Sequence, residues 1–185
     1  MQLFEFLMVL VSIIVGLGIA TLLTGIASLI RVRGSIRPYW VHTVLIALVF
    51  LAHAQVWWES WGLSPAPEWS FLGLLMMLGS PVCLFLISQL LFPESPRGVD
   101  LAEYYFQNSR IIWLLGAGAT LIATLLRPVF FGAPLLEVGN LASAPTLLVC
   151  LVLASTQSRR LHALLVPGLL LVVFLDTILV TGILA

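Results

Sequence analysis

The sequence alternates long apolar runs with short segments of arginine, proline, tryptophan and other polar residues. An α-helix needs about 20 apolar residues to cross a bilayer, and each run approaches or exceeds that length. The pattern therefore predicts an all-α fold: a polytopic membrane bundle of six transmembrane helices that forms one domain over residues 1–185. The predicted spans cover approximately 3–30, 39–61, 69–92, 108–126, 134–155 and 161–184.

The composition agrees with a membrane protein. The chain is 61% hydrophobic and only 9% charged, whereas a soluble domain usually has about a quarter of charged residues. A net charge of zero argues against a nucleic-acid partner, which would require a basic surface. The sequence contains no nucleophile elbow, phosphate loop or HExxH motif, so a non-enzymatic role is favoured.

The arginines predict the orientation of the bundle, because short cytoplasmic loops retain positive charge. In the six-span arrangement only Arg127 falls on one side of the membrane. Seven arginines fall on the other side: Arg31, Arg33, Arg37, Arg97, Arg110, Arg159 and Arg160. We therefore expect the N- and C-termini to lie outside the cell.

The first predicted span carries a stripe of small residues. Four of them recur every fourth position, and two glycines widen the stripe; the set is Ser12, Gly16, Gly18, Ala20, Thr24 and Gly25. Small side chains at this spacing let two helix backbones approach closely in lipid. We expect this helix to be the central packing element of the bundle.

Three prolines fall inside predicted spans: Pro81 in the third, Pro145 in the fifth and Pro167 in the sixth. Proline removes a helical hydrogen bond, so we expect kinked or broken helices at these positions. The similar segments GLGIATLL and GAGATL, which start at Gly16 and Gly116, are compatible with a 3+3 inverted repeat. Chance similarity between glycine-rich helices is the alternative.

Ionisable residues within spans are costly and often mark the path of an ion or substrate. His53 and Asp176 both lie about 12 Å below the outer surface of the hydrocarbon, counted along their helices. We expect them to interact, either in a structural hydrogen bond or in a proton-coupled transport site.

Other candidates for transport or proton relay lie near the same outer surface, and these are Gln55, Glu59, Arg127 and Glu137. Carboxylates near helix ends can also simply extend to the interface. Arg127 could pair with Glu137 across the outer loop.

A cofactor is not expected. A bis-histidine haem would need two facing helices, and only His42 with His162 lie at the same depth. Interfacial hydrogen bonds explain these two histidines more simply. The sequence has no close pairs of histidine and carboxylate residues that would indicate a metal site.

The segment between the third and fourth spans contains Asp100 followed three residues later by Glu103. This spacing is typical of a capping box at a helix start. It predicts a short helical lead-in that continues directly into the fourth span.

Three segments, VSIIVGLGIATLLTGI, RVRGSIRPYWVH and WWESWGL, resemble a group of small bacterial polytopic membrane proteins with no assigned activity. The resemblance covers mainly residues 9–63 and implies a bacterial cytoplasmic (inner) membrane. Two function classes remain. One is a channel or transporter with an outward-facing polar cavity lined by the second and sixth spans. The other is a non-catalytic accessory, lipid-binding or assembly subunit, with membrane lipids, a homo-oligomer or a membrane complex as its partners.

Overall fold

The computed structural model describes residues 3–63, 70–132, 134–135 and 143–184. In these ranges the chain is helical and forms no strands, which confirms the predicted all-α class. The helices are α1 (Leu3–Arg31), α2 (Trp40–Ser60), the short 3-10 helix η1 (Trp61–Leu63), α3 (Phe71–Leu90), α4 (Leu101–Phe131), α5 (Ser143–Ser155) and α6 (Arg159–Leu184).

Five described helices, α1, α2, α3, α4 and α6, are long and apolar enough to cross a membrane. The fifth predicted span, over 134–155, is described only in part and stays a prediction. Pro134 and Leu135 are not helical, 136–142 lie outside the described residues, and α5 has 13 residues. At about 1.5 Å per residue α5 is roughly 20 Å long, which is less than the hydrocarbon thickness of about 30 Å.

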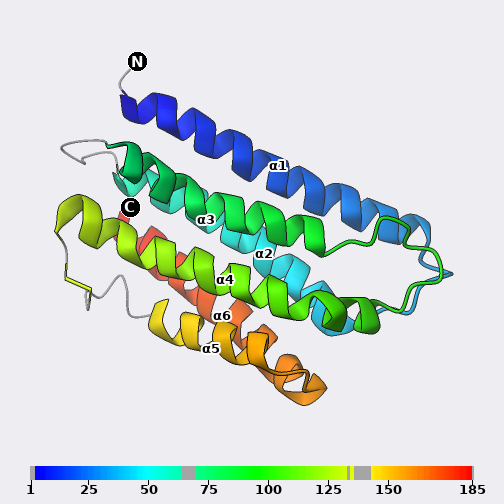
Figure 1. Cartoon of the computed structure of the whole chain (residues 1–185). Helices are drawn as coiled ribbons and strands as arrows, with labels where there is room; N and C mark the ends of the chain where they lie inside the picture. The colour runs from blue at the N-terminus through cyan, green and yellow to red at the C-terminus, as the bar shows by residue number, and fades with distance from the viewer. Residues whose placement is uncertain (1–2, 64–69, 133, 136–142, 185) are drawn as a thin grey trace.

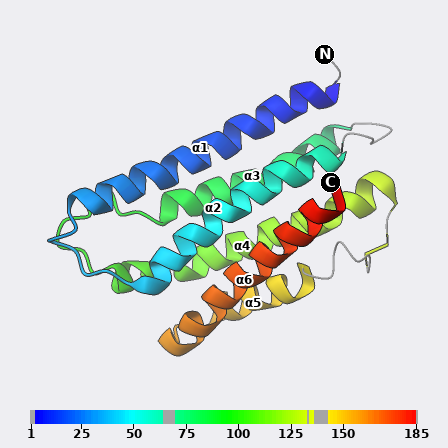
Figure 2. The same cartoon turned by 180° about the vertical axis from the view of Figure 1, so that it is seen from behind.

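The helices run side by side, and successive helices run in opposite directions (Figure 1). Both ends of the chain lie at one end of the bundle, which we call the terminus end. The links α1–α2, α3–α4 and α5–α6 lie at the opposite end, which we call the arginine end (Figures 1 and 2). Most arginines belong to these links or to the helix turns beside them: Arg31, Arg33, Arg37, Arg97, Arg159 and Arg160.

The central helix is α2, because it packs against α1, α3 and α6 and also touches α4. In Figure 2, α6 runs close to α2, and α1 lies at the edge of the bundle. The helix α1 packs along α3, whereas α4 packs along α5. The two halves are therefore packed differently, and the inverted repeat stays a prediction.

The packing face of α1 differs from the predicted one. Ser12, Gly16, Ala20 and Thr24 are exposed in the chain, and a methyl group added at Gly16 would meet nothing within 4 Å. The expectation that this row makes α1 the central packing element is therefore wrong.

Only two glycines of the stripe pack closely against other helices. Gly18 lies against the His53 imidazole of α2, and Gly25 lies against the Phe92 ring that follows α3. A Cβ atom at Gly18 would overlap Nε2 of His53. Other parts of the chain therefore approach α1 closely at Gly18 and Gly25, which are seven residues apart. These two glycines lie on a different face of α1 from Ser12, Gly16, Ala20 and Thr24.

None of the three prolines breaks a described helix. The helix α3 continues through Pro81, and α6 continues through Pro167. Pro145 is the third residue of the described helix α5. The interruption of a span at Pro145 stays a prediction, because the residues just before Ser143 lie outside the described ranges.

At the arginine end, the links α1–α2 and α3–α4 are joined by backbone hydrogen bonds. The Arg37 N–H donates to Val99 O at 3.0 Å, and the Leu101 N–H donates to Arg37 O at 3.0 Å. The Arg37 guanidinium also lies 3.9 Å from the Asp100 carboxylate, at an exposed position. We call this contact the 37–100 clasp.

The helix α4 begins where the capping box predicts. The Asp100 side chain accepts hydrogen bonds from the backbone N–H groups of Ala102 and Glu103, at 2.9 and 3.3 Å. These bonds satisfy N–H groups that a helix start leaves without partners. The amphipathic lead-in and the fourth span thus form one helix of 31 residues, which is longer than the predicted 108–126.

Candidate functional site

A single amide joins two carboxylates near the terminus end. The Gln55 Nε2 group donates to Oε1 of Glu59 at 2.8 Å and to Oδ2 of Asp176 at 2.7 Å. Gln55 and Glu59 are one helical turn apart on α2, so they share one face, and Asp176 belongs to α6. The two N–H bonds of one amide nitrogen match the two carboxylates. We call this cluster the Gln55 bridge.

The bridge lies within the apolar part of the bundle. Gln55 is eight residues before Leu63 and Asp176 is eight residues before Leu184. Each is therefore about 12 Å from the end of its helical segment, at 1.5 Å per residue. The sequence predicts that His53 of α2 and Asp176 of α6 lie at a similar depth. The two helices do make a polar contact at this depth, but the residue of α2 that bonds Asp176 is Gln55 and not His53.

A cavity of about 500 Å³ opens beside the bridge, between α1, α2 and α6. Gln55 and Glu59 line it from α2, the small residues Ser12 and Gly16 line it from α1, and Thr177 lines it from α6. We call this cavity the α1–α2–α6 groove. The exposed row on α1 is thus one wall of a groove.

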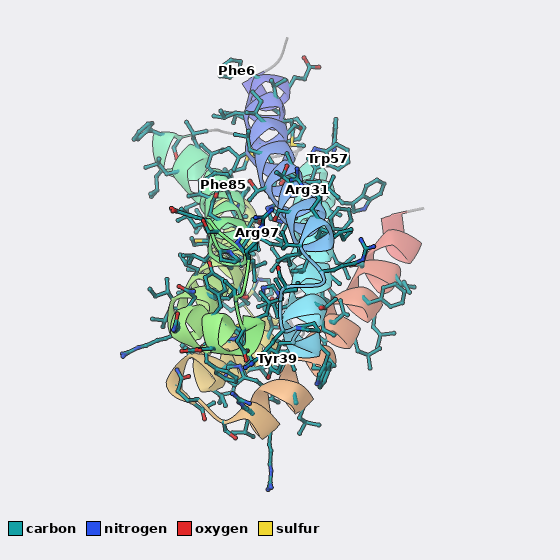
Figure 3. All side chains as sticks on the ribbon, turned by 90° about the vertical axis from the view of Figure 1, so that its right-hand side faces the viewer. Phe6, Arg31, Tyr39, Trp57, Phe85 and Arg97 are labelled. Atoms are coloured by element: carbon teal, nitrogen blue, oxygen red, sulfur yellow. The ribbon has the colours of Figure 1, made fainter. Side chains whose placement is uncertain are left out.

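Two tryptophans of α2, Trp57 and Trp58, also line the groove. The indole N–H of Trp57 donates to the Ser12 hydroxyl at 2.9 Å, which holds the ring against α1. In Figure 3, Trp57 lies on the flank of the molecule between α1 and the last turns of α6. The groove therefore combines aromatic walls with the Glu59 side chain, and Asp176 lies beside it through its bond to Gln55.

His53 does not take part in this site. Its Nδ1 donates to the Val49 carbonyl of its own helix at 2.8 Å, and its buried Nε2 faces Gly18 without a hydrogen-bond partner. Residues 53 and 55 point to opposite sides of α2, because successive helical residues are about 100° apart. The predicted interaction between His53 and Asp176 is therefore wrong.

The other two sequence candidates are not placed. Glu137 lies outside the described residues, and Arg127 belongs to α4 with a side chain that is also outside the described part. Their pairing stays a prediction.

A second polar network is buried near the arginine end. The Trp113 N–H donates to the Tyr105 hydroxyl at 3.0 Å, and this hydroxyl donates to Nδ1 of His162. The His162 Nε2–H donates to the Thr156 carbonyl at 3.1 Å. These directions follow because a carbonyl only accepts, so Nε2 carries the proton and Nδ1 accepts. We call this chain of bonds the Tyr105 network.

The Tyr105 network bears on the two histidines considered as haem ligands. Both ring nitrogens of His162 are hydrogen bonded, and Nε2 of His42 donates to the Leu91 carbonyl at 2.7 Å. Ligation through this pair would break bonds of His162, and we do not propose it. Within the described ranges, no group of three or more His, Cys, Asp or Glu side chains is placed to hold a metal ion.

The sequence did not lead us to expect the Gln55 bridge or the bond from Tyr105 to His162. Gln55 and Glu59 are four residues apart, and this spacing could have indicated a shared polar face on α2. The bond from Tyr105 to His162 joins residues that are 57 positions apart, so no local sequence pattern could indicate it.

Comparisons with protein-family models, curated proteins and solved structures found no match for this chain.

Proposed function

We propose that this chain is a multi-pass protein of a bacterial cytoplasmic membrane and that it transports a small solute through the α1–α2–α6 groove. Five of the described helices are long and apolar enough to span a membrane. The distribution of arginines favours a cytoplasmic arginine end, with both termini outside. The groove would then open near the outer surface.

The observation that carries this proposal is the Gln55 bridge beside a cavity. Its volume of about 500 Å³ falls within the roughly 300–1,000 Å³ that is usual for small-molecule sites. Polar and ionisable groups at membrane depth are costly, and they commonly line a substrate path. The bridge also connects α2 with α6, so a solute that displaces the amide would change the contact between two spanning helices.

A second candidate function is an accessory or assembly subunit. It is favoured by the exposed row of Ser12, Gly16, Ala20 and Thr24 on α1. A helix of a second copy or of another membrane protein could pack on such a row. In that case the groove would be filled by a helix, and no solute would pass.

Transport can be tested with purified protein in lipid vesicles on a solid-supported membrane, where a current reports the movement of a charged solute or of protons that move with a neutral one. A panel of organic cations, organic anions and neutral solutes with a proton gradient should include at least one class that gives a signal. Gln55→Leu should abolish that signal, whereas Gln107→Leu, the same change at an exposed residue of the arginine end, should preserve it. If no solute moves faster than in empty vesicles, with or without the gradient, the transport proposal is wrong.

The orientation is tested by reporters fused after Ala185. A reporter that works only outside the cytoplasm should be active, and a reporter that works only inside should be silent. The reverse result would place the groove on the cytoplasmic side.

A further inference from the structure

We infer that the arginine end binds the headgroup of an anionic phospholipid through Arg31, Arg33 and Arg97, which belong to two neighbouring links. This surface lies at the opposite end of the bundle from the α1–α2–α6 groove, so the inference does not depend on transport. It follows from the arrangement of the two links, from the charges that remain unpaired there and from the apolar surface beside them.

Backbone hydrogen bonds hold the two arginine-bearing links against each other. In addition to the 37–100 clasp, the Gly98 N–H donates to the Ser35 carbonyl at 2.9 Å. Arg97 directly precedes Gly98, and Arg33 lies two residues before Ser35, so this bond brings the two arginines to neighbouring positions. In Figure 3, which is viewed from this end, Arg97 also lies near Arg31. The three cations therefore sit on segments that are fixed to each other.

Positive charge exceeds negative charge in these links. The segment 31–39 contains three arginines and no carboxylate, and the segment 91–100 adds Arg97, Glu94 and Asp100. Asp100 is paired with Arg37, which leaves three arginines against Glu94. Every residue of both segments is described, and within the described ranges none of these three arginines forms an ion pair. The surface therefore attracts an anion.

The free guanidinium groups match the chemistry of a phosphate. Arg31 and Arg33 each donate one long hydrogen bond to a backbone carbonyl of α1, at 3.3 and 3.4 Å. A guanidinium has five N–H donors, so most donors of each side chain remain for a ligand. Two parallel N–H groups of arginine fit two oxygens of a phosphate, and such charge-assisted bonds are stronger than neutral ones.

An apolar strip of α1 leads to these arginines. Leu23 and Ile30 are two helical turns apart and share one face, and they are 55% and 56% exposed. Ile30 directly precedes Arg31, and its carbonyl accepts the bond from Arg33. An acyl chain that lies along this strip would therefore place its phosphate at the two guanidinium groups.

An anionic lipid fits this surface better than a zwitterionic lipid or a free phosphate. The ammonium group of a zwitterionic headgroup would be brought close to three arginines, and like charges at short range repel each other. A free phosphate would gain nothing from the apolar strip, and its attraction to exposed arginines is screened by salt. A lipid with a net negative headgroup uses both parts of the surface.

Binding can be measured with two lipids that share the same acyl chains. Dioleoyl phosphatidylglycerol and dioleoyl phosphatidylethanolamine are titrated against the full chain in an uncharged maltoside detergent, and bound lipids are counted by native mass spectrometry. Phosphatidylglycerol should bind at least about tenfold more tightly, because each arginine near a membrane surface favours an anionic lipid by about fivefold. Equal binding, or tighter binding of phosphatidylethanolamine, would overturn the proposal.

Variants locate the site. Arg33→Gln and Arg97→Gln should each weaken phosphatidylglycerol binding by about fivefold and leave phosphatidylethanolamine binding unchanged. Arg160→Gln removes the same charge at an exposed position of the α5–α6 link and is the control, which should keep the affinity of the unmodified chain. Equal losses in all three variants would mean that lipids respond only to the net charge of this end, and the proposed site would be wrong. If one of the two test variants does not fold, the other still decides.

A competition experiment separates a lipid site from a site for a free anion. Inorganic phosphate is added to the complex with phosphatidylglycerol, and sodium chloride at the same ionic strength is added in parallel. The two salts should release the lipid to the same extent, because both act by screening. Greater release by phosphate would overturn the lipid in favour of a free anion.

Discussion

The two ends of the bundle use polar side chains in opposite ways. In the Tyr105 network every donor has an acceptor within the protein, and the side chains of Tyr105, Trp113 and His162 are at most 3% exposed. At the Gln55 bridge one amide serves two carboxylates at the wall of a cavity. Burial and hydrogen bonding thus distinguish the closed Tyr105 network from the partly exposed Gln55 bridge, at which we propose that a solute binds.

The largest loss of stability should come from removing the central hydroxyl of the Tyr105 network. Tyr105→Phe removes a hydroxyl that accepts from Trp113 and donates to His162, and it leaves two buried polar groups without partners. Each such group costs about 1–3 kcal/mol of unfolding free energy. Thermal unfolding in detergent should therefore shift to clearly lower temperature. Tyr104→Phe, at a half-buried neighbour, is the control, and equal losses in both variants would mean that the network is not stabilising.

A smaller loss of stability is expected from changes at Gly18, on the face of α1 that packs against α2. Gly18→Ala places a methyl group against the buried His53 ring, and overpacking of this kind costs about 1–3 kcal/mol. Gly16→Ala adds the same methyl group on the groove side, where it meets nothing within 4 Å, so its melting temperature should stay that of the unmodified chain. If Gly16→Ala were the more damaging of the two, α1 would pack through the row spaced by four, as in an assembly with a second helix.

The smallest effect on stability should come from changes at the Gln55 bridge. Gln55, Glu59 and Asp176 are only partly buried, so water in the cavity can replace the amide in Gln55→Leu. We expect a change of less than about 1 kcal/mol in unfolding free energy, together with loss of the transport current. A loss of stability as large as that of Tyr105→Phe would show that the bridge is another structural network.

The limits of α1, α2, α3 and α6 can be predicted closely from the sequence, because they follow from local patterns of apolar residues, whereas α4 extends beyond the predicted 108–126. The runs at 3–30 and 39–61 correspond to Leu3–Arg31 and Trp40–Ser60, and the cap at Asp100 follows from the spacing of two residues. The run at 134–155 is different, because it begins with Pro134 and Leu135, which are apolar but not helical. Apolar composition alone does not make a helix.

The contacts between helices cannot be predicted in the same way. The depth of a residue in the membrane is counted along its helix, so the similar depth of His53 and Asp176 follows from the sequence. The rotation of α2 about its own axis does not follow from the sequence, and this rotation turns Gln55 rather than His53 toward Asp176. For the same reason the spacing of small residues indicates the row that contains Gly16, although α1 packs through another face. Whether a small residue packs depends on a partner such as His53 or Phe92, which comes from a distant part of the chain.

The 37–100 clasp has a consequence for the order in which the protein is assembled during synthesis. The clasp needs only the first 101 residues, because Arg37 bonds Val99 and Leu101, so the link after α1 can engage the start of α4 before α5 and α6 have been made. The groove, in contrast, is lined by Thr177 of α6, and the Gln55 bridge beside it needs Asp176 of the same helix, so both depend on a helix that is made after α5. A ribosome that stops before α6 would therefore leave the two links joined but the groove without its α6 wall, and the proposed transport would require chains in which α6 has been inserted.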